Sequence, residues 1–169
     1  WKIVTFHHSI YSVASHATEG DILDRRNELV PVFKELDIDV VLMGHDHVYV
    51  RTYMMNGLTP ITKSDKYTDS NDDGIPESVT NPDGILYVTA NSASGSKFYT
   101  IQNQQFPYAA VQNQERVPNI SRVDVSDTAF TITTYRTSDM SVVDTFAIYR
   151  TPEATPDIEG VIISQVYGG

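Results

Sequence analysis

Four of the five histidines in this sequence lie in two short stretches, each directly after an apolar run. His7 and His8 follow one run, and His45 and His47 follow another in the order Gly-His-Asp-His. Neutral imidazole is a common ligand for transition metals. Histidines two positions apart can each reach a different ion of a close pair, and such pairs lie about 3.5–4 Å apart. Because the chain has no cysteine, a metal here must use His, Asp, Asn or Glu.

The elements around these histidines predict that they converge. Residues 3–6 and 37–44 are apolar runs typical of buried strands. Between them, residues 21–36 have the helical period, with Leu29, Val32, Phe33 and Leu36 on one face. Pro31 is expected to kink this helix or restart it. A strand, helix and strand in this order form a parallel, right-handed unit. The carboxyl ends of parallel strands meet at the crevice where such sheets bind ligands.

A plainer interpretation exists for each histidine. A single histidine at the end of a strand is usually a polar side chain that meets solvent. The clustering at two strand ends favours metal ligation for His7, His45 and His47. His8 is instead expected to be a structural residue or to support a ligand.

The remainder of the chain predicts mainly antiparallel strands. Residues 56–80 are a polar insertion rich in Asp, Asn, Pro and Gly, and residues 92–119 are typical of a loop. The other apolar segments predict strands at 85–91, 120–127, 129–136 and 142–150. The fold class is therefore α/β, with a βαβ unit followed by antiparallel strands. We expect one domain over 1–150, a Pro-rich linker over 151–160 and the first strand of a following domain over 161–169.

The overall composition argues against some classes of function. The chain has 169 residues and a formal net charge of −10. Nucleic-acid binding is therefore unexpected, since it relies on Lys and Arg to displace counterions. No apolar run reaches the length of about 18 residues that a membrane span needs. The chain enters a strand at once, with no signal peptide and no initiator Met, which is typical of the middle of a longer protein.

The segments VTFHHSIYS and GDILDRRNELVPVFKELDIDVVLMGHDHVYVRT resemble the carboxyl-terminal half of calcineurin-like metallophosphoesterases, in the purple-acid-phosphatase-like branch. The resemblance rests on Val-x-x-His at His7 and on Gly-His-x-His, with Tyr49 and Arg51 behind it. It implies half of a layered, metallophosphoesterase-like β-sandwich flanked by helices. It also implies two Zn, Mn or Fe ions, with His7 and His45 on one and His47 on the other. The reaction would be hydrolysis of a small phosphate ester.

The resemblance also assigns a role to His16 and reveals a gap. His16 lies where the family often has a histidine that contacts phosphate and protonates the leaving group; a solvated loop histidine is the alternative. Ala17 replaces a second histidine found there in the family. The family's earlier Gly-Asp and Gly-Asn-His motifs, which supply a bridging aspartate and an asparagine, are absent. We therefore expect the isolated chain to be inactive without the N-terminal half of the same catalytic domain.

Two other segments raise separate hypotheses. Asp69, Asn71 and Asp73 match the start of a calcium loop, although Thr80 stands where the last glutamate belongs. This favours a solvated acidic turn, or a rival function as a non-enzymatic, secreted, calcium-stabilised β-rich module. The segment SASGSKFY forms either a tight turn or a wall of the substrate cleft, in which Lys97 meets the phosphate.

The last nine residues, VIISQVYGG, resemble the first strand of bacterial lamin-tail-like domains. This resemblance, together with the lack of cysteine, leads us to expect a multidomain protein outside the cell or on the surface of a bacterium.

Overall fold

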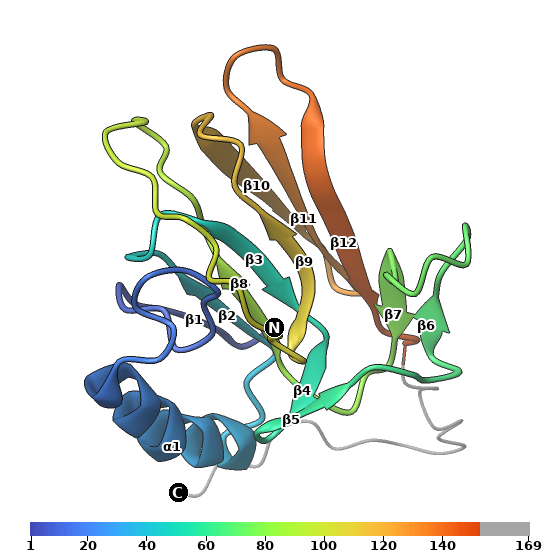
Figure 1. The fold of residues 1–169 in the computed structure, drawn as a ribbon. Coiled ribbons are helices and arrows are strands. Elements are labelled where there is room, and N and C mark those ends of the chain that lie inside the picture. The colour runs from blue at the N-terminus through green and yellow to red at the C-terminus, as the bar shows by residue number, and fades with distance from the viewer. Residues whose placement is uncertain (153–169) are drawn as a thin grey trace, which may run out of the picture.

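The computed structural model describes residues 1–152, which form three layers (Figure 1). The first sheet has the strand order β1-β2-β8-β3-β9 and the second has the order β10-β11-β12-β7-β6. The bounds are β1 (Ile3–Thr5), α1 (Gly20–Glu35), β2 (Val40–Met43), β3 (Tyr49–Thr52), β4 (Met54–Asn56), β5 (Thr59–Ile61), β6 (Tyr67–Thr68), β7 (Ser78–Thr80), β8 (Leu86–Thr89), β9 (Ala109–Asn113), β10 (Asn119–Val125), β11 (Ala129–Arg136) and β12 (Val142–Tyr149).

The parallel part of the first sheet is the predicted βαβ unit. β1 pairs with β2 in parallel, and β2 pairs with β8 in parallel. β3 and β9 then continue the sheet in antiparallel fashion. The carboxyl ends of β1 and β2 therefore lie side by side, as the sequence predicts.

The main core lies between the two sheets. Every second side chain of a strand points to the same face, so β2 and β8 each send alternate residues inward. The buried residues of this core are Val40, Tyr49, Met54, Val79, Leu86, Val88, Phe130, Ile132, Phe146 and Ile148. A second core fills the space between the first sheet and α1, which includes Val30, Phe33, Val41, Met43 and Tyr87.

Helix α1 matches the predicted bounds within one residue but differs from the prediction in two ways. Pro31 lies inside a single 16-residue helix, so the expected restart is absent. The predicted apolar face is also divided. Phe33 is buried at 7% exposure, whereas Val32 and Leu36 are 46% and 54% exposed. A helix that packs on one sheet buries a single stripe, and here Val30 and Phe33 form that stripe.

The three long antiparallel strands predicted near the end of the chain are confirmed as β10, β11 and β12. The polar segment 56–80 is more regular than its composition indicates. It contains β5, β6 and β7, and β7 joins the second sheet parallel to β12. Val79 alone anchors β7 in the core, which is too small an apolar signal to find in the sequence. Strand β9 likewise falls in a segment that we expected to be a loop.

A buried ion pair joins the two sheets. Arg51 of β3 is 1% exposed, and its Nε donates to Asp144 Oδ2 of β12 at 2.6 Å. The hydroxyl of Tyr49 donates to the same carboxylate at 2.7 Å. The guanidinium of Arg51 also lies 4.4 Å from the centroid of the Phe146 ring. Arg51 thus acts in the core, where its charge is paired as burial demands.

No helix within residues 1–152 is long and apolar enough to cross a membrane. The predicted strand over 161–169 and nearly all of the predicted linker lie outside the described residues.

Candidate metal centre

The imidazoles of His7 and His45 meet at the carboxyl ends of β1 and β2. Nε2 of His7 lies 3.0 Å from Nδ1 of His45. His8 and His16 surround them, with ring centroids 4.7 Å and 4.6 Å from that of His45. The parallel pairing of β1 with β2 brings these residues together, although about 40 positions separate them in the sequence.

The turn that presents His45 and His47 has an unusual backbone. Both residues have positive φ, of 68° and 42°. Such conformations are uncommon for residues other than glycine, cost about 1–3 kcal/mol each, and occur preferentially at functional sites. Gly44, directly before them, does not have positive φ. The two histidines themselves adopt the left-handed conformation.

Asp46 holds this turn in place. Its carboxylate is fully buried. It accepts hydrogen bonds from the hydroxyl of Ser12 and from the backbone N–H of His16, the latter at 3.2 Å to each oxygen. The side chain therefore fixes the loop that carries His16, and its Oδ1 lies 4.0 Å from Nε2 of that histidine.

The loop before α1 is itself anchored from several sides. Residues 9–14 are at most 1% exposed. Four side chains from other elements donate to its backbone carbonyl groups: Arg26 to Ile10, Thr89 to Tyr11, Tyr108 to Ser12 and Gln102 to Ala14. A loop tied at this many points holds His16 in one position over His45. Glu19 Oε2 lies 2.8 Å from Nδ1 of His16.

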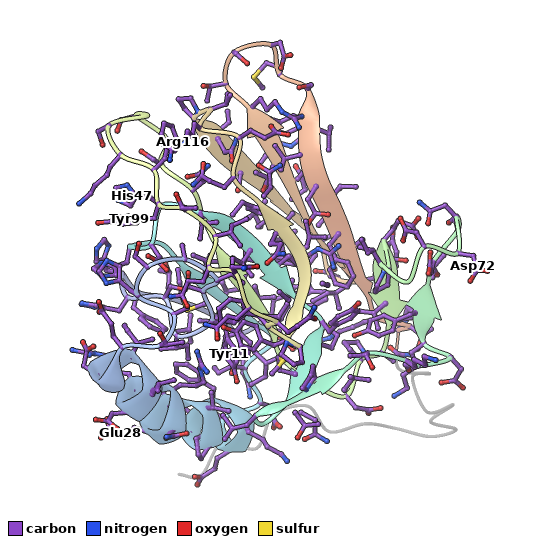
Figure 2. All side chains as sticks on the ribbon, viewed as in Figure 1. Tyr11, Glu28, His47, Asp72, Tyr99 and Arg116 are labelled. Carbon is purple, nitrogen blue, oxygen red and sulfur yellow. The ribbon has the colours of Figure 1, made fainter. Side chains whose placement is uncertain are left out.

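His47 is oriented by the segment that contains Lys97. Its Nδ1 lies 2.9 Å from the carbonyl oxygen of Lys97, which can only accept a hydrogen bond. Nδ1 of His47 therefore donates this hydrogen bond, which leaves Nε2 as the nitrogen that could bind a metal. The Tyr99 ring contacts both His47 and His16, with centroids 5.3 Å apart in each case. Figure 2 shows His47 and Tyr99 close together at one edge of the molecule.

Lys97 lies close to this cluster. Its ammonium group is 4.7 Å from the centroid of the Tyr99 ring. It forms no ion pair with any carboxylate of residues 1–152. The segment that contains it therefore borders the histidine cluster.

Burial and neighbouring imidazoles set the charge of His45. Partial burial lowers its pKa, electrostatic repulsion from the imidazoles of His16, His8 and His7 lowers the pKa further, and the carboxylate of Asp46 partly opposes this shift. A ligand histidine must be neutral, so this shift favours metal binding.

The donor set fits part of a metal site. The nitrogens of His7 and His45 are closer than twice a Zn–N distance of about 2.1 Å, so one ion can contact both. Within the described chain, however, no group of three His, Cys, Asp or Glu side chains converges to hold an ion. These residues therefore match two imidazole ligands of one site, with His47 nearby, and they contribute no carboxylate.

The acidic loop lies at the far side of the molecule, where Figure 2 labels Asp72. Its polar side chains form hydrogen bonds within the loop. Asp69 Oδ2 accepts from the N–H of Gly74 at 2.8 Å, and Asp73 Oδ1 accepts from the N–H of Ile75 at 2.8 Å. These contacts are typical of a tight polar turn.

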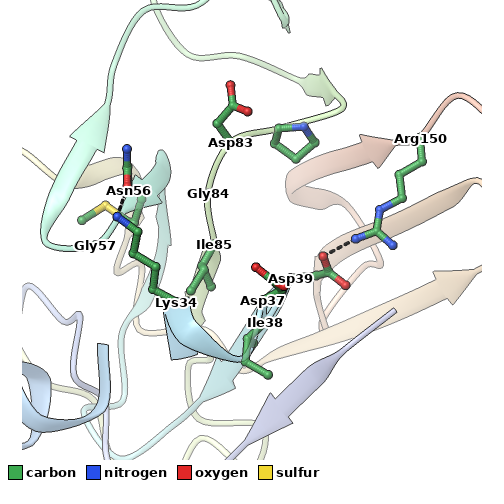
Figure 3. Close-up of a pocket in the computed structure, with 12 residues that line it drawn as sticks. Lys34, Asp37, Ile38, Asp39, Asn56, Gly57, Asp83, Gly84, Ile85 and Arg150 are labelled. Atoms are coloured by element: carbon green, nitrogen blue, oxygen red, sulfur yellow. Dashed lines mark hydrogen bonds and ion pairs between the residues drawn. The ribbon is translucent and has the colours of Figure 1, made fainter. Parts of the chain in front are cut away.

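A cavity of about 350 Å³ lies at the opposite end of the sheet from the histidines (Figure 3). Asp39 precedes β2 and Gly84 precedes β8, so the cavity faces the amino ends of these strands. Arg150 is paired with Asp39 there, and Nζ of Lys34 donates to Asn56 at 2.9 Å. The cavity is separate from the candidate metal centre.

The three-layer arrangement is a metallophosphoesterase-like fold. Its solved relatives include the purple acid phosphatase PPD1 from yellow lupin, with a TM-score of 0.66 and 17% identity over 89% of this chain and 25% of that chain. Vps29 from Chaetomium thermophilum aligns over 86% of this chain and 55% of its own, at 16% identity and with a TM-score of 0.39.

One curated relative matches at higher identity over a short region. Purple acid phosphatase 17 from Arabidopsis thaliana is 43% identical over 47 residues, which is 28% of this chain and 13% of that protein. No protein-family model matches the chain. The chain thus spans about an eighth of this curated relative and a quarter of the lupin structure.

The sequence did not reveal every residue that shapes the centre. Tyr99 and the buried Asp46 network become apparent only when distant segments meet, and Glu19, three residues after His16, was overlooked. The one available signal for Asp46 was its position between two candidate ligands.

Proposed function

We propose that this chain is the carboxyl-terminal part of the catalytic domain of a dinuclear-metal phosphoesterase. The main observation in support of this proposal is the contact between His7 and His45 at the ends of adjacent parallel strands. The fold and the short match to a purple acid phosphatase support the proposal. The substrate would be a small phosphate ester.

In the complete domain, His7 and His45 would hold one ion of Zn, Mn or Fe, and His47 the other. Bound metal ions lower the pKa of a water molecule and stabilise charge on the phosphoryl oxygens. His16 would protonate the leaving group, because it lies against His45 and its Nδ1 is next to Glu19. Lys97, the nearby cation, would attract the phosphate.

Metal binding gives a direct test. We expect the chain to bind Co²⁺ or Zn²⁺ weakly, and His7→Ala or His45→Ala to abolish that binding in a calorimetric titration. His8→Ala is the matched control, because His8 is an imidazole in the same cluster without an assigned ligand role. Equal binding by the His7 and His45 variants and the unchanged chain would refute the assignment.

The isolated chain should have little or no phosphatase activity. A catalytic zinc site usually has about three protein ligands, and the described residues bring together only two. An aryl phosphate assay with added Zn²⁺, Mn²⁺ or Fe²⁺ would compare this chain with a polypeptide extended upstream by about 150 residues, one further domain's worth. We expect turnover only in the longer polypeptide, with loss on His45→Ala or His47→Ala. Strong turnover by the short chain would contradict the proposal.

The alternative is a secreted, calcium-stabilised module that is not an enzyme, with Ca²⁺ held by Asp69, Asn71 and Asp73. These residues do form a compact loop. A ligand that binds only the folded state raises the melting temperature. A rise with Ca²⁺ that is lost on Asp69→Ala, without any response to Zn²⁺, would favour this alternative.

A further inference from the structure

β1 is the last strand at one edge of the first sheet, although its apolar sequence is typical of a buried strand. β1 lies at the end of the order β1-β2-β8-β3-β9 and pairs only with β2 among the described strands. Its outer edge therefore presents backbone N–H and C=O groups without a sheet partner. Parallel strands are usually covered on both faces, yet Ile3 is 40% exposed.

Helix α1 leaves a second apolar stripe in solvent beside this edge. This stripe consists of Val32 and of Leu36, the C-cap residue four positions further along, which lie on one side. Leu29, on the neighbouring turn, instead packs against the core that Val30 and Phe33 share with the sheet. Val32 and Leu36 are the two most exposed apolar residues of the helix and its C-cap.

The stripe and the edge are neighbours. Nζ of Lys2, the residue before β1, donates to the carbonyl oxygen of Leu36 at 2.8 Å. Side chains alternate along a strand, and Val4 faces α1, so Ile3 faces the opposite side of the sheet. Apolar side chains are therefore uncovered on both sides of the same edge.

We infer that the open edge of β1 and the stripe Val32 and Leu36 form one docking surface for a further parallel strand with its covering helix. Only another backbone can pair with the polar groups of β1, and only an apolar layer can cover the stripe. A bare extended peptide would satisfy the edge and leave the stripe exposed. The helix-covered strand fits both, since parallel strands carry helices on their faces.

The occupant that we assign is the rest of the catalytic domain, so this inference rests on the proposed function. The chain spans only 25% of the lupin structure that shares its fold. A strand added parallel to β1 would end beside His7. A strand docked on this surface would therefore bring the remaining metal ligands next to His7.

A double substitution tests this surface. Val32→Lys with Leu36→Lys changes two exposed residues, so the melting temperature of this chain should stay within about 2 °C of its original value. In a polypeptide extended upstream by about 150 residues, the same pair should lower the melting temperature by about 5 °C or more. Val125→Lys with Val142→Lys is the control, because both residues are exposed to a similar extent on the second sheet. That pair should leave both polypeptides unchanged.

Hydrogen exchange and oligomeric state complete the test. Backbone amides of β1 should exchange more slowly in the longer polypeptide than in this chain. An equal effect of the lysine pair in both polypeptides would overturn the inference. So would a dimer of this chain that the pair converts to a monomer, because the occupant would then be a second copy. If the β1 amides exchanged more slowly in the longer polypeptide but that polypeptide showed no metal-dependent turnover, the docking surface would be supported and the proposed function refuted.

Discussion

Asp46 shows how one side chain shapes the candidate centre without being a ligand. It separates two histidines of positive φ, and its buried carboxylate joins the turn to the loop before α1. The strain of the turn is tolerated because Ser12 and the His16 N–H hold Asp46 in place. The geometry of the centre therefore depends on a buried residue that joins its two loops.

Asp46→Ala should destabilise the chain by about 1–3 kcal/mol, because it leaves the Ser12 hydroxyl and the His16 N–H buried without their acceptor. Urea denaturation measures this change. Asp65→Ala is the control, since Asp65 is exposed and makes no side-chain hydrogen bond within residues 1–152. That control should shift stability by less than about 0.5 kcal/mol. If Asp46→Ala lowered stability by as little as the control does, the turn would not depend on the hydrogen bonds of Asp46.

At the scale of elements, the pair formed by Arg51 and Asp144 connects β3 to β12 across the sandwich. The sequence assigns Arg51 to a family motif next to the histidines. The structure gives it a packing role, because its charge is neutralised within the core. Burial of this pair ties the sheet that carries the histidines to the second sheet.

Asp144→Ala should lower the free energy of unfolding by about 3–5 kcal/mol, because it leaves the buried Arg51 charge unpaired. The double change Arg51→Met with Asp144→Leu should recover most of that loss, because no charge remains in the core. Chemical denaturation of both variants gives the comparison. Asp124→Ala breaks the exposed pair with Arg122 and should cost at most about 1 kcal/mol. Equal costs for the buried and exposed pairs would contradict the role of Arg51.

The sequence predicted the elements that carry strong periodic signals. The βαβ unit and β10 to β12 have consecutive or alternating apolar residues, and all of them form. β7 and β9 were missed because each is short and places few apolar residues in the core. The contact between His7 and His45 followed from topology. The positive φ values at His45 and His47 did not, since they depend on the tertiary contacts of Asp46.

At the scale of the whole molecule, a cluster of buried tyrosines should control stability in alkali. Burial raises the pKa of Tyr11 and of Tyr108 to about 12, although the charge of Arg26 lowers both. Unfolded tyrosine has a pKa of about 10. The stability that these residues contribute is therefore intact below pH 10 and is lost as the pH rises towards 12.

We expect the free energy of unfolding to fall by at least about 1 kcal/mol for each of these tyrosines between pH 10 and pH 12. Urea denaturation at several pH values measures the fall. Tyr11→Phe should make the dependence on pH shallower. Tyr149→Phe, at an exposed position, should leave it unchanged. A profile that is flat up to pH 12 would show that the tyrosines ionise without unfolding the chain.

The first residue of the chain lies against strands from its far end. Trp1 donates from Nε1 to the Ser126 carbonyl oxygen at 2.7 Å, its ring centroid is 6.0 Å from that of Phe130, and the Arg150 guanidinium lies 4.2 Å from its ring. Since it is the sole tryptophan in the sequence, its fluorescence reports one event, the closure of the second sheet over the start of the first. Contacts of such long sequence separation form slowly during folding. A stopped-flow refolding trace excited at the tryptophan band would therefore time the arrival of the last strands.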